Sequence, residues 1–163
     1  MNKKGSMRVV VNAKKQLMTI YKNDEVFKTF PVSTSKFGIG NKIGSRKTPL
    51  GKHKISAKFG KNAPEGSIFN GSRNTGEIIS QNEDFYKGQD LITTRILQLE
   101  GLEEGINKGD GIDSAKRYIW IHGTTQESMI GKPASQGCIR MKNKDIIIFF
   151  DIVRVGTKVE ITK

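Results

Sequence analysis

The chain has 163 residues, a formal net charge of +12 and a single cysteine. This length suits one domain with a substantial core, while a lone cysteine excludes an internal disulfide and fits a reducing compartment. No apolar run is long enough to span a membrane, and the first residues contain no apolar stretch of the length that a secretory signal needs. We therefore predict one domain over residues 7–163, preceded by a polar tail or cloning remnant at residues 1–6.

The predicted location depends on the native N-terminus. A full-length chain without a leader is expected in the cytoplasm, whereas removal of a leader would place the protein in the periplasm or cell wall. No membrane association is expected in either case, and we expect a monomer.

Positive charge is concentrated in the first third of the chain. Residues 1–62 contain 15 Lys/Arg and two acidic residues, whereas residues 63–163 contain 13 Lys/Arg and 14 acidic residues. Such a surface attracts acidic ligands. No motif for DNA or RNA binding accompanies the basic residues, so nucleic acid is not an expected partner. A solvated lysine-rich exterior and a non-enzymatic module that binds polyanions both remain compatible with the charge.

Strand patterns dominate along the chain, and the fold class is predicted to be mainly β. The first three strands read as an antiparallel meander. The predicted strands are residues 7–12, 16–21, 25–32, 52–59, 76–80, 91–99, 117–121 and 158–162. One helix is expected near the C-terminus, with Asn143 as its cap and an apolar body over residues 146–152. The long connections at residues 60–75 and 100–116 are typical of loops that form sites.

The chemistry-bearing pair is Cys138 and His122, because a thiolate can attack a carbonyl while an imidazole moves protons. A lone cysteine is more often an inert buried residue. Three neighbours favour a nucleophile nevertheless. Gly137 permits a sharp turn whose N–H groups can face an anion. Arg140 can lower the thiol pKa and bind a carboxylate. The carbonyl of Gly123 can orient the imidazole.

Other chemistries fit the sequence less well. Two histidines and one cysteine without close spacing make a poor zinc set, so we expect no metal and no cofactor. His53 lies in the strand predicted at residues 52–59, where it is either an ordinary strand residue or part of a substrate groove.

The motifs Ile121-His-Gly-Thr124 and Ser135-Gln-Gly-Cys-Ile-Arg-Met141 resemble the signature of the L,D-transpeptidase catalytic domain of the YkuD type. Pro31-Val-Ser-Thr34 and Thr48-Pro-Leu-Gly51 resemble two further elements of that family in the same order. The resemblance extends over residues 7–161. The chain departs from it at Gln136, where the family often has histidine, so a second proton-handling residue is not expected there.

The resemblance implies a mainly β fold, described as a β-sandwich or barrel, with one main helix near the C-terminus. It also implies roles for individual residues. Cys138 would be the nucleophile and His122 the general base and acid, oriented by Gly123 and supported by Ser135. The backbone N–H groups of Gly137 and Cys138 would form the oxyanion hole.

The substrate would bind beside this nucleophile. Arg140 is the expected carboxylate anchor or loop organiser. Gln136, Thr48 and His53 are the remaining candidates for substrate binding.

The reaction that the resemblance implies is acyl transfer on peptidoglycan stem peptides or muropeptides. Cys138 would form a thioester at the L-centre of diaminopimelate with loss of D-alanine, and carbapenems would acylate the same sulfur. An amine acceptor would then give L,D-transpeptidation. Some leaderless relatives resemble cytoplasmic L,D-carboxypeptidases that trim tetrapeptides to tripeptides in wall recycling, so hydrolysis is the alternative outcome.

Overall fold

The fold is built around one ten-stranded sheet in a computed structural model that describes residues 5–163. Residues 1–4 of the expected polar tail lie outside the described residues. The strands are β1 (Met7–Asn12), β2 (Leu17–Lys22), β3 (Glu25–Pro31), β4 (Gly51–Phe59), β5 (Ser67–Asn70), β6 (Arg73–Ile78), β7 (Ile92–Gly101), β8 (Trp120–Thr124), β9 (Ile139–Met141) and β10 (Lys158–Thr162). The helices are α1 (Glu83–Tyr86) and α2 (Asn143–Ile152), with 3-10 turns at Ile79–Gln81 and Glu127–Met129.

The sheet runs in the order β3-β2-β1-β10-β4-β7-β5-β6 and forks at β7, which also pairs with β8. β1, β2 and β3 form the predicted antiparallel meander. β10 returns to lie between β1 and β4, parallel to β1 and antiparallel to β4. β8 is antiparallel to β7 and parallel to β9, so the two strands that flank the His122–Cys138 segment are neighbours.

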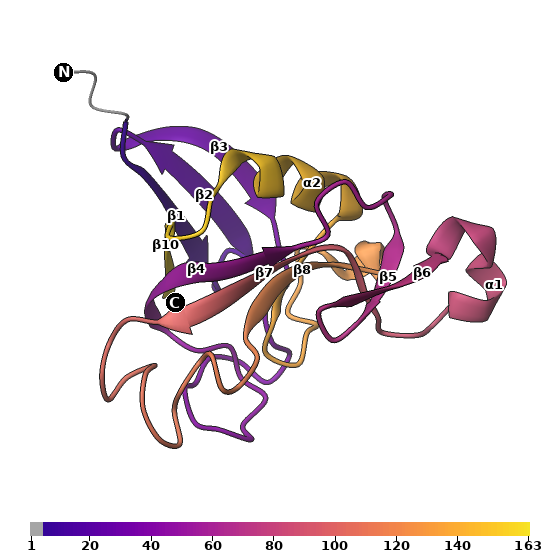
Figure 1. Cartoon of the computed structure of the whole chain (residues 1–163). Helices are drawn as coiled ribbons and strands as arrows, with labels where there is room; N and C mark the ends of the chain where they lie inside the picture. The colour runs from indigo at the N-terminus through magenta and orange to yellow at the C-terminus, as the bar shows by residue number, and fades with distance from the viewer. Residues whose placement is uncertain (1–4) are drawn as a thin grey trace.

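The core lies between the curved sheet and helix α2, which contacts β7 and β8 (Figure 1). Alternate residues of the strands enter it, as the period-two pattern of β1 illustrates: Val9 and Val11 are buried, and Val10 between them is not. From α2, Ile146, Phe149 and Phe150 pack against these strands. The prediction of a mainly β fold with one main helix is therefore confirmed.

Several element boundaries differ from the predictions. The strand expected at residues 117–121 begins only at Trp120, because Tyr118 has a φ of +55° and turns the chain before β8. The expected strand at 76–80 is shifted to Arg73–Ile78 and ends in a 3-10 turn. The long connection at 60–75 contains β5 and the start of β6.

The predicted cap of α2 is wrong. Asn143 is the first residue of the helix, and its side chain is buried instead of bonding its own helix end. Its Oδ1 accepts hydrogen bonds of 2.6 Å from the hydroxyls of Thr93 and Thr94, and its Nδ2 donates to the carbonyl of Thr124 at 3.0 Å. Asn143 thus ties the helix to β7 and β8.

Candidate active site

Strand pairing places His122 and Arg140 next to each other on β8 and β9. Ile121 and Ile139, which precede them, are also paired and point into the core. Because successive side chains of a strand alternate between its faces, His122 and Arg140 point away from that core. Cys138 is the last residue before β9, so it lies at the end of the parallel β8–β9 pair where both strands begin.

These residues line one cavity of about 280 Å³. Its walls are Asp90, Ile92, His122, Ser135, Gln136, Cys138 and Arg140. Five of these seven residues are candidates from the sequence. Asp90 and Ile92 were not predicted from the sequence: Ile92 is the first residue of β7 and pairs with Thr124 of β8, and Asp90 lies just before this strand.

The sulfur of Cys138 is held between two backbone groups of the preceding turn and strand. Its thiol donates to the carbonyl of Tyr118 at 3.3 Å and accepts from the N–H of Trp120 at 3.4 Å. Burial raises the pKa of the Cys138 thiol, against the lowering effects of the Trp120 N–H, Arg140 and Arg117. The expected influence of Arg140 is therefore present in direction, but burial outweighs it and the resting group is a neutral thiol.

The imidazole of His122 is oriented by its own chain. Its Nδ1 lies 2.6 Å from the carbonyl oxygen of Gly123, which fixes Nδ1 as the donor and leaves Nε2 to accept a proton. Burial lowers the pKa of His122 to about 4, with an opposing contribution from the Gly123 carbonyl. The pair at rest is thus a neutral thiol and a neutral imidazole.

The close packing at Gly123 requires the absence of a side chain. An ideal Cβ at this position would lie 2.6 Å from both the Asn143 Oδ1 and the Thr93 carbonyl oxygen. Thr93 is directly opposite Gly123 in the β7–β8 register, and a bulge follows it in β7. Thr94 in this bulge has a φ of +72°, which is unusual for a β-branched residue.

Ser135 and Thr48 shape the turn before Cys138. The hydroxyl of Ser135 donates to the Cys138 carbonyl at 2.5 Å and accepts from the Gly137 N–H at 3.2 Å. Thr48 donates to the Gly137 carbonyl at 2.9 Å from the other side, and it is fully buried. Gly137 itself has a φ of +126°, in the region that favours glycine. Thr48 therefore contacts the turn and does not line the cavity.

The two backbone N–H groups expected to form the oxyanion hole differ in whether they already donate a hydrogen bond. The N–H of Gly137 is directed to Ser135, whereas the N–H of Cys138 makes no hydrogen bond to any group within residues 5–163. Of the two, the Cys138 N–H is the one free to donate to a substrate.

Arg140 and His53 lie in settings that differ from the expected ones. The guanidinium of Arg140 pairs with the carboxylate of Asp90 and donates to the Gln126 Oε1 at 3.0 Å. His53 is fully buried away from the cavity, with its ring nitrogens 2.9 Å from the Gly51 carbonyl and 2.8 Å from the Ser114 hydroxyl. The structure thus does not bring His53 to the substrate groove that the sequence suggested.

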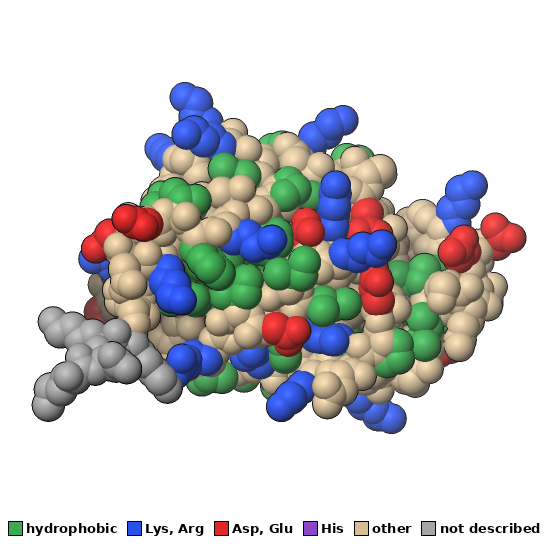
Figure 2. Space-filling view, turned by 90° about the horizontal axis from the view of Figure 1, so that it is seen from above, with side chains coloured by type: hydrophobic (Ala, Val, Ile, Leu, Met, Phe, Trp, Pro, Cys, Tyr) green, Lys and Arg blue, Asp and Glu red, His purple; other side chains and the backbone are tan. Residues whose placement is uncertain are grey.

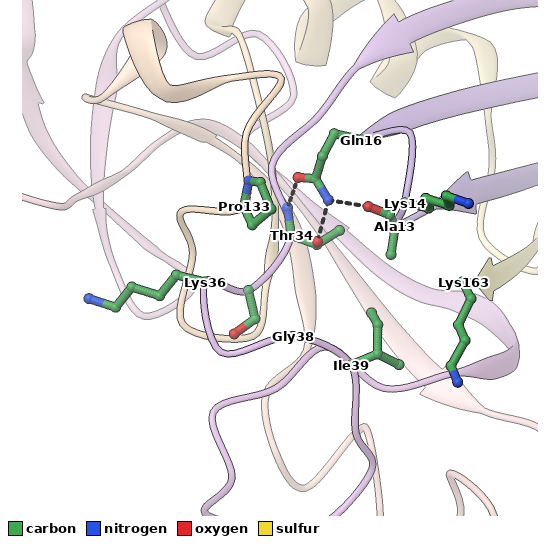
Figure 3. Close-up of a pocket in the computed structure, with 10 residues that line it drawn as sticks. Ala13, Lys14, Gln16, Thr34, Lys36, Gly38, Ile39, Pro133 and Lys163 are labelled. Atoms are coloured by element: carbon green, nitrogen blue, oxygen red, sulfur yellow. Dashed lines mark hydrogen bonds between the residues drawn. The ribbon is translucent and has the colours of Figure 1, made fainter.

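A second cavity, of about 400 Å³, lies beside the turn between β1 and β2, and neither cysteine nor histidine lines it (Figure 3). In its wall, the Gln16 amide nitrogen donates to the Ala13 carbonyl and the Thr34 hydroxyl, and its Oε1 accepts from the Thr34 N–H. The amines of Lys14, Lys36 and Lys163 at its rim point in different directions (Figure 3). Within residues 5–163 there is also no group of three or more His, Cys, Asp or Glu side chains that could hold a metal ion.

The structure thus defines a mainly β domain with a cysteine and an oriented histidine in one cavity, an arrangement of the kind that thiol chemistry uses. Comparison with known proteins specifies the family. The profile of the YkuD L,D-transpeptidase catalytic domain matches residues 6–161. The chain belongs to this family.

Individual relatives agree with this assignment. A putative L,D-transpeptidase YkuD of Bacillus licheniformis is 50% identical over 48 residues, which is 29% of this chain and 29% of that protein. The aligned segment therefore spans under a third of that curated relative.

Solved structures show the same fold. The L,D-transpeptidase LdtMt1 in complex with imipenem has a TM-score of 0.58 at 20% identity, over 97% of this chain and 59% of that one. L,D-transpeptidase 3 from Mycobacterium tuberculosis, in complex with a faropenem-derived adduct, has a TM-score of 0.60 at 12% identity, over 98% and 61%.

Proposed function

We propose that this protein catalyses cysteine-dependent acyl transfer on peptidoglycan stem peptides. The observation that carries the proposal is the placement of Cys138 and His122 in one cavity. Family membership supplies the substrate class, and the His122–Gly123 contact supplies the correct tautomer for a base. Within residues 5–163 no helix is long and apolar enough to cross a membrane.

The first half-reaction starts from the neutral pair. His122 Nε2 takes the thiol proton while the Cys138 sulfur attacks the carbonyl at the L-centre of diaminopimelate. A C–S bond forms, and the free Cys138 N–H donates to the developing oxyanion. The imidazolium then returns the proton to the leaving amine as the C–N bond breaks. D-Alanine departs, and a thioester remains on Cys138.

The second half-reaction resolves the thioester. Attack by an amine gives L,D-transpeptidation, whereas attack by water gives L,D-carboxypeptidase trimming of a tetrapeptide to a tripeptide. Imipenem is expected to acylate the same sulfur, because the related LdtMt1 was solved in complex with it.

Mass spectrometry of the purified protein tests the proposal. The wild type is incubated with a disaccharide-tetrapeptide, with and without an added amine, and separately with imipenem. We expect D-alanine release, and one imipenem adduct on the single cysteine. Cys138→Ala should abolish both, while Ser128→Ala, at an exposed serine, should abolish neither. Unchanged turnover in Cys138→Ala would refute the mechanism. A dimeric product identifies a transpeptidase, and tripeptide alone identifies a carboxypeptidase.

The alternative of a non-enzymatic polyanion-binding module has less support from the surface. Lys and Arg side chains on the face in Figure 2 are interspersed with acidic and apolar side chains. The diverging lysines of Figure 3 likewise do not converge on one ligand. This alternative predicts binding to polyanions that weakens with salt and is unaffected by Cys138→Ala.

A further inference from the structure

The cavity beside Cys138 contains one cation and one carboxylate, and the two are not equally accessible. The side chain of Arg140 is 4% exposed, and its Nη1 and Nη2 donate to Gln126 and Asp90. Two of its five N–H donors are thereby used within the protein, and its burial limits contact with a substrate carboxylate. Arg140 thus serves mainly to hold the neighbouring polar side chains.

The side chain of Asp90, in contrast, is accessible. Its side chain is 38% exposed, and only its Oδ2 is engaged, by Arg140. Its Oδ1 accepts no hydrogen bond from residues 5–163 and is free to accept one from a ligand. No other acidic side chain lines this cavity among the described residues. An accessible carboxylate selects a cationic group, and a primary ammonium with three donors suits a single free oxygen.

We propose that Asp90 binds the primary ammonium of the acyl acceptor beside the Cys138 thioester and thereby favours attack by that amine over attack by water. This inference rests on the proposed function and concerns its second step. The acceptor amine is an alkylamine, which is protonated at neutral pH, so it arrives as the cation that Asp90 recognises. Asp90 acts here as a specificity residue.

The proton balance uses His122. Burial holds the pKa of His122 at about 4, so its Nε2 is unprotonated at neutral pH. The bound ammonium first loses one proton to solvent, and His122 Nε2 takes the second proton from the attacking nitrogen as the C–N bond forms. The freed lone pair attacks the thioester carbon, a C–N bond forms and the C–S bond breaks. Of the two protons that the nitrogen loses, one returns through His122 to the sulfur and the other goes to solvent.

A donor peptide also carries a side-chain ammonium, so the experiment needs two parts. The first measures binding without turnover. Cys138→Ala is titrated with a tetrapeptide whose side-chain amine is free, and with the same peptide acetylated on that amine. We expect the free amine to bind roughly tenfold more tightly, which is the scale of one charge-assisted hydrogen bond. The difference should disappear when Asp90→Asn is added and persist when Asp84→Asn is added, because Asp84 is an exposed acid that does not line this cavity.

The second part measures the partition of the acyl-enzyme between amine and water. Asp90→Asn should lower the ratio of aminolysis to hydrolysis with the tetrapeptide acceptor by roughly tenfold, and leave the ratio with hydroxylamine, which is uncharged at pH 8, unchanged. Asp90→Glu, which keeps the charge opposite buried Arg140, should recover part of the ratio. Thermal melts of each variant verify the fold.

Each outcome has a distinct meaning. Equal binding of the free and acetylated peptides, or a difference that survives Asp90→Asn, overturns the inference. Slower acylation in Asp90→Asn with an unchanged partition ratio also overturns it, because the ammonium bound would then be that of the donor. Absence of any imipenem adduct on wild-type Cys138 refutes the proposed function instead, and the binding part still decides the role of Asp90.

Discussion

Replacing Gly123 by alanine should damage both the packing of the fold and the orientation of His122. The added Cβ would lie 2.6 Å from two oxygens, one on the Asn143 side chain and one on the Thr93 backbone. Ordinary C···O contacts begin near 3.3 Å, so the overlap is roughly 0.7 Å on each. The Asn143 amide can move, but the Thr93 carbonyl belongs to the central strand β7 and cannot move without disturbing the sheet.

The expected magnitude has two parts. Overpacking of a core typically costs about 1–3 kcal/mol, and a displaced Asn143 weakens its hydrogen bonds to Thr93 and Thr94, at about 1 kcal/mol each. The free energy of unfolding should therefore fall by about 2–4 kcal/mol. Because the carbonyl of residue 123 also orients the His122 Nδ1, acylation of Cys138 should slow by roughly a hundredfold for a displacement near 1 Å.

Two assays separate these effects. Urea denaturation followed by the fluorescence of Trp120, the only tryptophan, reports stability, and intact-mass analysis of imipenem adducts reports acylation of the folded protein. Gly40→Ala is the matched control, because the nearest atom to its Cβ belongs to the flexible side chain of Lys47. The reasoning would be refuted if Gly123→Ala unfolds within about 0.5 kcal/mol of the wild type. Normal acylation in a destabilised variant would refute the orienting role alone.

Three further predictions concern neighbouring groups. The free energy of unfolding should fall by up to about 3 kcal/mol as the pH drops from 6.5 to 4, because His122 of the unfolded chain then binds a proton that buried His122, with a pKa of about 4, does not. Denaturation midpoints measured across this range should depend less steeply on pH in His122→Gln. An equally steep dependence would contradict the lowered pKa of His122. Asn143→Ala should cost about 2–4 kcal/mol in urea unfolding, because it leaves buried hydroxyls without their acceptor, whereas Lys144→Ala at the exposed next position should change little. The rate of alkylation of Cys138 by iodoacetamide should reach half its maximum above the pH typical of a free thiol, because burial raises its pKa; a midpoint below that of a cysteine peptide would contradict this direction.

Strands whose own sequence alternates were predictable with few errors. β1 and β10 have the predicted bounds, β3 and β4 differ by one residue at one end, and β2 is shifted by one residue at both ends. β5 and β9 were missed because they have four and three residues, and their pairing with β7 and β8 defines them rather than any local pattern. The late start of β8 depends on the positive φ of Tyr118, a conformation that its residue type does not predict.

The residues of the candidate active site were also predictable only in part. Cys138 and His122 were identifiable because they are rare residue types in glycine-containing motifs. Asp90 was not, since it lies 48 residues before the cysteine, in the loop that leads into β7, and only the tertiary fold brings it to the cavity. The pairing of Arg140 with Gln126 and Asp90 was equally unpredictable, because these two residues come from separate loops.

The position of β10 has a consequence for how the chain acquires its fold during synthesis. The final strand lies between β1, which is made first, and β4. Until Lys158–Thr162 has left the ribosome, the β1–β3 hairpins and the β4–β7 half have no hydrogen-bonded connection to each other through the sheet. Both would expose unpaired strand edges, which are prone to association with other chains. A variant truncated before residue 158 should therefore aggregate rather than fold as a smaller domain.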